Sequence, residues 1–126
     1  MKLGLLLPPN PSQGDPKWKL ARQIGVNHAI AKLAPDLTGD DPIWEIESLR
    51  RSKDRFEAAG FELTALEGDQ FDMNRIKLGL PGRDEDLDRY CQMIENMAKL
   101  GIRLLCYNFM GGVGWFRTQT AVEVRG

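Results

Sequence analysis

The chain has 126 residues, of which 42% are hydrophobic and 28% are charged, and this is enough for one globular domain with a buried core. Its 17 basic and 18 acidic residues give a formal net charge of -1. Because no excess of positive charge is available to attract phosphate groups or anionic lipids, we expect no nucleic-acid partner and no membrane partner.

The first apolar stretch, residues 3–9, is too short to cross a bilayer and has no small-residue cleavage pattern, so a cytoplasmic location is expected. Cys91 and Cys106 match no zinc-binding spacing and are too few for a disulfide framework. We expect both thiols to be reduced, structural residues, because free cysteines are usually buried.

Strands and helices are expected to alternate along the whole chain. Apolar runs predict strands at residues 2–7, 28–33, 61–67 and 102–109. The first two helices are predicted to begin at Asp15-Pro16 and Asp41-Pro42, where a carboxylate caps the helix and proline occupies its first position. The third is predicted to open with the acidic residues 84–86, which favour the positive end of a helix dipole.

Apolar side chains at helical spacing predict which helix faces cover the sheet. On the second helix they are Leu49, Phe56 and Ala59, and on the third they are Leu87, Cys91, Ile94, Met97 and Ala98. Gly25, Gly60 and Gly101 each follow a helical run and precede an apolar residue, which predicts three helix ends at the spacing of one strand, one helix and two loops.

This alternation predicts an α/β fold with parallel strands, because strand–helix–strand crossovers are right-handed. It leaves two architectures open, an open doubly wound sheet and a slice of a (β/α)8 barrel. In both, the ligand site lies at the carboxyl ends of the strands, and here the long loops follow the strands, at residues 8–15, 34–41, 67–86 and 108–126. Prolines replace the glycine-rich phosphate loop after the first strand, so nucleotide binding of the Rossmann type is not expected.

One long segment, residues 76–110, reads IKLGLPGRDEDLDRYCQMIENMAKLGIRLLCYNFM and closely resembles mannonate dehydratases, in which an IKLGLPGRD loop precedes a helix and a strand that ends in CYNFM. Glu67 at the end of the third strand and residues 115–118, Trp-Phe-Arg-Thr, also resemble that family. The sequence departs from it at residues 111–114, Gly-Gly-Val-Gly, where many members carry a proline and an aspartate. This difference concerns the shape of the loop and the choice of sugar acid.

The resemblance implies that residues 1–126 form a single domain, the amino-terminal half of a xylose-isomerase-like TIM barrel. It also implies a cytoplasmic lyase of glucuronate catabolism that dehydrates D-mannonate to 2-keto-3-deoxy-D-gluconate with Mn²⁺ or Fe²⁺. The family's metal ligands come from later strands, so this fragment is expected to bind no metal and to be inactive alone. His28, the one histidine, begins a strand at the opposite edge and is expected to be structural.

Six residues are candidates for binding a small sugar acid: Lys32, Glu67, Tyr107, Asn108, Trp115 and Arg117. Arg117 or Lys32 could meet the substrate carboxylate, Glu67 could orient substrate or a metal-bound water, and Trp115 could cover the apolar face of the sugar. Strand alternation predicts that only one of Tyr107 and Asn108 faces the site. Each of these side chains could instead be solvated or structural, and no catalytic residue is predicted.

Two other functions compete with the dehydratase. The chain could be a non-catalytic half-barrel module for binding or assembly, forming a homo-oligomer that pairs the exposed edges of its first and last strands. It could also belong to a sugar isomerase or epimerase of the same superfamily. An isomerase or epimerase would lack the IKLGLPGRD and CYNFM segments seen here.

Overall fold

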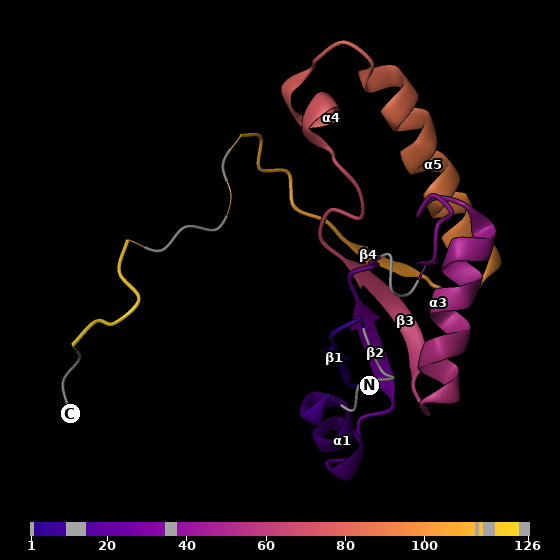
Figure 1. The fold of residues 1–126 in the computed structure, drawn as a ribbon, viewed down its shortest axis with the longest axis vertical. Helices are drawn as coiled ribbons and strands as arrows, with labels where there is room; N and C mark the ends of the chain where they lie inside the picture. Colours follow the sequence, from indigo (N-terminus) through magenta and orange to yellow (C-terminus); the bar gives the residue numbers. More distant parts are fainter. Residues whose placement is uncertain (1, 10–14, 35–37, 113, 115–117, 124–126) are drawn as a thin grey trace.

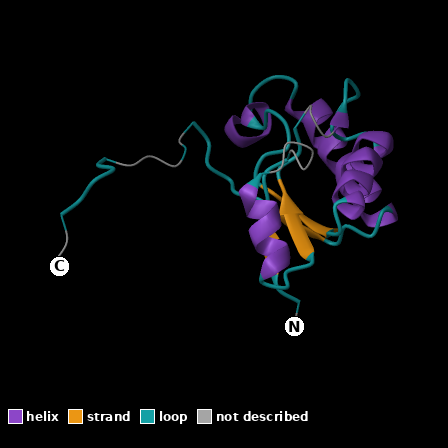
Figure 2. Ribbon diagram, turned by 60° about the horizontal axis from the view of Figure 1, so that its bottom comes forward, coloured by secondary structure: helices purple, strands orange, loops and turns teal. Residues whose placement is uncertain are grey.

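The computed structural model describes residues 2–9, 15–34, 38–112, 114 and 118–123. Its elements, in chain order, are β1 (Gly4–Leu6), α1 (Pro16–Gln23), β2 (His28–Ala31), α3 (Ile46–Ala58), β3 (Glu62–Glu67), α4 (Asn74–Leu78), α5 (Arg83–Lys99) and β4 (Leu104–Cys106) (Figure 1). The helices are grouped around the strands, and residues 118–123 lie apart from them (Figure 2).

The strands form one parallel sheet in the order β1-β2-β3-β4. A doubly wound sheet reverses its strand order at a switch point, whereas the strands of a (β/α)8 barrel follow one another around the sheet. The described strands have no such reversal. The fold is therefore α/β with the strand order of a partial barrel, as the sequence predicted.

The three predicted glycine stops end helices in the same way. At the end of α3, Gly60 has φ +84° and its N–H donates to the Glu57 carbonyl, while the N–H of Phe61 donates to the Phe56 carbonyl, both at 2.9 Å. This is the Schellman pattern, in which a left-handed residue that suits glycine closes the last turn. Gly25 after α1 and Gly101 after α5 repeat it.

The predicted helix starts were right for α1 and wrong for α3. Asp15 caps α1, with its Oδ1 accepting the N–H of Lys17 at 2.8 Å. Asp41 does not cap α3, which begins at Ile46, directly after a turn closed by the Glu45 N–H and the Pro42 carbonyl at 3.0 Å. The Asp41 carboxylate instead pairs with the guanidinium of Arg51. Helix α4 was not predicted at all, because it lies within a segment expected to be loop.

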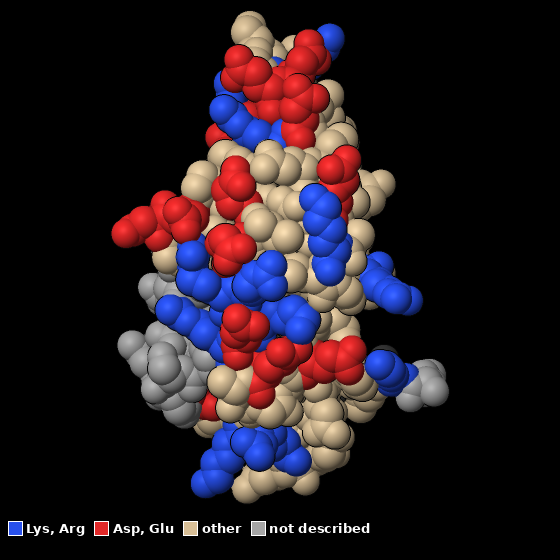
Figure 3. All heavy atoms as spheres, turned by 90° about the vertical axis from the view of Figure 1, so that its right-hand side faces the viewer, with Lys and Arg blue, Asp and Glu red and all other residues tan. Residues whose placement is uncertain are grey.

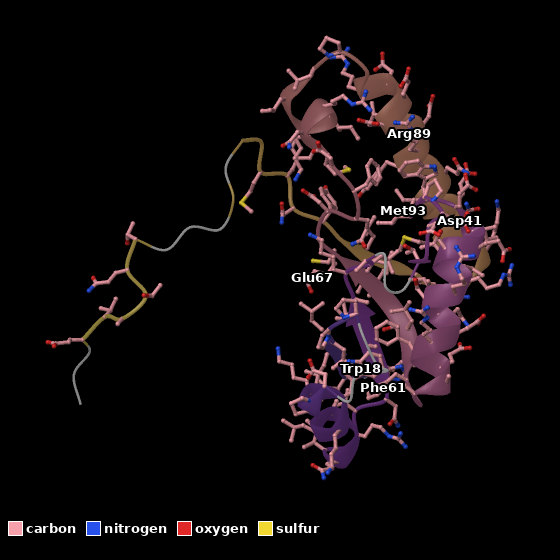
Figure 4. All side chains as sticks on the ribbon, viewed as in Figure 1. Trp18, Asp41, Phe61, Glu67, Arg89 and Met93 are labelled. Carbon is pink, nitrogen blue, oxygen red and sulfur yellow. The ribbon has the colours of Figure 1, made fainter. Side chains whose placement is uncertain are left out.

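Aromatic packing joins the first two long helices. Trp18 of α1 stacks on Phe56 of α3 with ring centroids 4.6 Å apart, and meets Phe61 edge-on at 5.1 Å (Figure 4). The Trp18 indole N–H donates to the Pro8 carbonyl at 3.1 Å, so the buried ring leaves no polar atom unpaired. Contact between consecutive helices is expected when successive right-handed crossovers place their helices on one side of a sheet.

The stripe predicted for α3 is confirmed, since Leu49 and Phe56 are fully buried and Ala59 packs against the core. The stripe predicted for α5 is largely wrong. Met97 is buried, but Leu87 and Ile94 are 41% and 43% exposed, and Cys91 is exposed.

The buried face of α5 lies one position away along the helix, on Met93, Asn96 and Met97. This face can include Asn96 because its side-chain amide donates to the Trp44 carbonyl at 3.0 Å, so the polar residue is buried with its hydrogen bond satisfied. The expectation that both cysteines are buried is also wrong, because Cys91 and Cys106 are both free and exposed.

One face of the sheet carries a row of apolar side chains that is exposed at its two ends. Leu6 pairs with Ile30, Ile30 with Ala65, and Ala65 with Leu104, so these residues share a face. Leu6 and Leu104, at the two edges, are 52% and 56% exposed. The next row, Ala31, Leu66 and Leu105, belongs to the core under the helices. An apolar row facing away from the helices is what a barrel interior requires.

The outer surface mixes charges of both signs. On the face that α3 and α5 present, Lys and Arg side chains alternate with Asp and Glu side chains over most of the surface (Figure 3). No helix within the described residues is both long and apolar enough to cross a membrane.

Candidate functional site

The carboxyl edge of the sheet carries the predicted carboxylate. Glu67 is the last residue of β3 and pairs in register with Cys106, the last residue of β4. The N–H of Gly68 donates to the Cys106 carbonyl at 2.8 Å and extends this pairing by one residue. Because the neighbouring Leu66 points into the core, alternation directs the Glu67 side chain to the open face, away from α3 (Figure 4).

Lys32 follows β2 at the same edge and is exposed. It lines a hollow of about 220 Å³ with Leu6, Leu7, Pro8, Pro9 and Lys17. Two lysine side chains therefore border one hollow, and their positive charges are suited to a carboxylate. Lys17 was not predicted from the sequence. The feature that could have identified Lys17 is its position in the first turn of α1, the helix that follows the carboxyl end of β1.

Tyr107 and Asn108 line a different and larger cavity of about 440 Å³. Its other lining residues are Gly68, Asp69, Met73, Ile76, Leu87, Tyr90, Ile94, Leu105 and Phe109. Strand β4 ends at Cys106, earlier than expected, so the alternation predicted for Tyr107 and Asn108 does not apply and both border the same space. Glu67, Lys32 and this pair lie at one edge of the sheet but not in one cavity.

Asp69 and Tyr90, which line this cavity, interact with other polar groups. The ammonium of Lys77, whose side chain is only 3% exposed, pairs with the carboxylate of Asp69. Burial raises the pKa of Tyr90 above its ordinary value of 10.0, and the negative charges of ionised Tyr107 and of Asp69 raise it further. Tyr90 is therefore a neutral hydroxyl at physiological pH.

A side chain not predicted from the sequence, Gln70, joins the ends of β2 and β3. Its Oε1 accepts the N–H of Leu33 at 2.9 Å, and its Nε2 donates to the carbonyls of Glu67 and Gly68, each at 2.9 Å. Gln70 is 4% exposed. It thus lies under the edge that carries Lys32 and Glu67.

Comparison with known proteins decides the family. Residues 16–125 match the family model described as D-mannonate dehydratase (UxuA). The chain belongs to this family. It is 38% identical over 99 residues to a mannonate dehydratase of Thermotoga petrophila, covering 78% of this chain and 27% of that protein. It is 36% identical over 104 residues to one of Brachyspira hyodysenteriae, covering 82% of this chain and 28% of that protein.

The fold of a solved mannonate dehydratase agrees. The enzyme of Streptococcus suis serotype 2 superposes with a TM-score of 0.73 at 27% sequence identity, over 94% of this chain and 33% of that one. The chain therefore spans about a quarter to a third of the length of the mannonate dehydratases it matches.

An ion pair at the buried carboxylate of Asp86 joins the two ends of the IKLGLPGRD segment. Asp86 in the first turn of α5 accepts from Arg75 of α4 and from Arg89, the latter at 2.8 Å. Burial alone would raise the pKa of Asp86, but the hydrogen bonds and charges of Arg75 and Arg89 outweigh it and hold that pKa below its usual 3.8. Arg89 also lies over the ring of Trp44, 5.2 Å from its centroid.

The described residues include no group of three or more His, Cys, Asp or Glu side chains that could hold a metal ion. His28 begins β2 at the opposite edge, as expected, with its Nδ1 3.2 Å from an Oε2 of Glu62. The remaining two substrate-binding candidates, Trp115 and Arg117, lie outside the described residues.

Proposed function

We propose that the polypeptide containing this chain dehydrates D-mannonate to 2-keto-3-deoxy-D-gluconate, and that residues 1–126 form one domain contributing the first four strands of its barrel. Membership of the D-mannonate dehydratase family over residues 16–125 carries this proposal. In the reaction a proton leaves the carbon beside the carboxylate, and the hydroxyl on the next carbon departs as water.

The residues of this chain bind and orient the sugar acid. Lys32, with Lys17 beside the same hollow, attracts the substrate carboxylate. Glu67 on the open face accepts hydrogen bonds from sugar hydroxyls. Tyr107 or Asn108 adds a polar contact after β4, Arg117 offers a second bidentate partner for the carboxylate, and Trp115 covers the apolar face of the sugar.

We further propose that the family's divalent ion, Mn²⁺ or Fe²⁺, is held by residues outside this chain. The support is that the described residues hold no group of three suitable ligands. When bound, such an ion supplies positive charge to a developing negative charge on the substrate. It follows that the 126-residue chain alone does not turn over D-mannonate when MnCl₂ is added.

The test is product formation by the whole polypeptide that contains this sequence. Purified with its metal, it should release 2-keto-3-deoxy-D-gluconate from D-mannonate, and at least tenfold less product from D-gluconate, the epimer at the carbon that loses the proton. No product from D-mannonate with either Mn²⁺ or Fe²⁺ would overturn the proposal. Turnover by the isolated chain would overturn only the part concerning the metal.

The exposed side chains of Leu6 and Leu104, at the two ends of the apolar row, favour a second candidate. These side chains leave apolar surface at both edges of the sheet. A non-catalytic half-barrel would cover it by pairing with a second copy of the chain. Light scattering on the 126-residue chain distinguishes the two, since this candidate requires a dimer and is contradicted by a folded monomer.

A further inference from the structure

The amide of Gln70 replaces a missing stretch of strand pairing. The β2–β3 ladder ends at the pair Ala31 and Leu66. Beyond it the chain of Leu33 is still buried, with 4% exposure, so its N–H needs a partner. Gln70 Oε1 is that partner at 2.9 Å, and the Nε2 of the same amide donates to the carbonyls of Glu67 and Gly68 at the end of β3.

Two of the three peptide units that Gln70 contacts are next to the candidate binding residues. The Leu33 N–H belongs to the peptide that follows Lys32, and the Glu67 carbonyl belongs to the peptide that follows Glu67. Fixing a peptide plane restricts the direction of the Cα–Cβ bond beside it. One buried side chain therefore restricts the direction of two side chains, that of Lys32 just after β2 and that of Glu67 at the end of β3.

We propose that Gln70 is a positioning residue for the sugar-acid site, holding Lys32 and Glu67 at a fixed separation at the carboxyl edge. The inference rests on the proposed function, because the sugar acid is the ligand that these two side chains contact. A positioning residue acts through its neighbours, so its loss weakens catalysis while substrate-contacting groups remain present.

Two variants of the whole polypeptide separate this role from simple stability. Gln70→Met keeps the length of the side chain and removes all three hydrogen bonds. Gln70→Glu keeps the acceptor for Leu33 but cannot donate while ionised, and regains one donor when protonated. Gln92→Met is the matched control, because the Gln92 amide also bonds across elements, to Glu45 Oε1 at 3.3 Å, but between helices away from the edge.

The rate of amide hydrogen exchange at Leu33 reports, independently of activity, whether Gln70 holds the ends of β2 and β3 together. Exchange should be at least tenfold faster in Gln70→Met than in wild type, and unchanged in Gln92→Met. Over the same variants kcat/KM for D-mannonate should fall at least tenfold for Gln70→Met and less than twofold for Gln92→Met. Relative to wild type, Gln70→Glu should recover activity as the pH falls from about 7 to about 5.

Unchanged Leu33 exchange in Gln70→Met would overturn the inference. Faster Leu33 exchange in Gln70→Met with kcat/KM equal to that of wild type would overturn it as well. So would a ratio of Gln70→Glu activity to wild-type activity that does not change as the pH falls. Absence of turnover by the wild-type polypeptide would instead overturn the proposed function, and the exchange experiment would still decide whether Gln70 holds the two strand ends together.

Discussion

Arg75 and Asp86 are joined by two parallel hydrogen bonds, Nε to Oδ2 and Nη2 to Oδ1, both 2.7 Å long. They connect α4 to the first turn of α5 across the LGLPG segment, so the ends of the most specific sequence motif are tied together. Asp86 is 3% exposed and Arg89 supplies its third hydrogen bond. This geometry explains why an acidic first turn, expected only to favour the helix dipole, holds a tertiary contact.

Replacing Asp86 by Asn should destabilise the fold and remove part of its acid sensitivity. The pKa of Asp86 is lowered in the folded state, so unfolding makes this carboxyl bind a proton more tightly. Its stabilising contribution is therefore complete above the usual value of 3.8 and is lost as the pH falls through it toward the folded-state pKa. Thermal unfolding between about pH 3 and pH 6 should show a weaker pH dependence for Asp86→Asn than for wild type. Asp88→Asn, exposed on the same helix, should match wild type, and an unchanged profile for Asp86→Asn would contradict the role of this ion pair.

Gly82→Ala should cost more stability than the same change at Gly101. Both glycines have left-handed φ, +86° and +77°, so each loses about 1 kcal/mol from backbone strain. A Cβ on Gly82 would also lie 2.3 Å from an Nη1 of Arg75, whereas nothing lies within 4 Å of one on Gly101. The additional loss of unfolding free energy in Gly82→Ala over Gly101→Ala, measured by urea denaturation, reports the displacement of Arg75 from Asp86. Equal costs would mean that Arg75 moves aside without loss.

Truncating Trp18 should remove the aromatic contact between α1 and α3. Trp18→Ala empties the space beside Phe56 and Phe61 and should lower the free energy of unfolding by about 3–5 kcal/mol. Leu20→Ala is the control on the same helix, because Leu20 is 56% exposed and should change stability by less than about 0.5 kcal/mol. Similar values for both would contradict the packing described.

Both thiols should react in the folded protein. Cys91 and Cys106 are free and exposed, so a disulfide-exchange reagent such as Ellman's reagent should modify two thiols per chain without denaturant. Cys91→Ser and Cys106→Ser should each remove one equivalent. A requirement for denaturant would show that other parts of the polypeptide cover these positions.

Sequence patterns a few residues long correctly predicted three helix ends and the cap of α1, because these features depend on contacts between nearby residues. Gly25, Gly60 and Gly101 each end a helix through bonds to residues a few positions away, and Asp15 caps α1 through the nearby N–H of Lys17. Asp41 carries the same local signal but failed as a cap, because a distant guanidinium, that of Arg51, occupies its carboxylate.

The parts of the site that were missed depend on contacts between segments distant in sequence. Gln70 meets Leu33, 37 residues away, and nothing in the neighbourhood of Gln70 indicates this partner. The stripe of Leu87, Cys91 and Ile94 has the spacing of a buried face, yet Leu87 and Ile94 border the cavity beside Tyr107. Periodicity identifies a helix face but not which surface covers it.

The central claim, that the carboxyl edge of this sheet binds the sugar acid, is tested most directly by two identical substitutions on one strand. Glu67→Gln changes the carboxyl end of β3, and Glu62→Gln changes its amino end, where Glu62 is 3.6 Å from Lys2 and close to His28. With D-mannonate and the whole polypeptide, kcat/KM should fall at least tenfold for Glu67→Gln, about 1.4 kcal/mol of transition-state stabilisation, and stay within about twofold of wild type for Glu62→Gln. Wild-type activity in Glu67→Gln, or a loss confined to Glu62→Gln, would contradict the placement of the site.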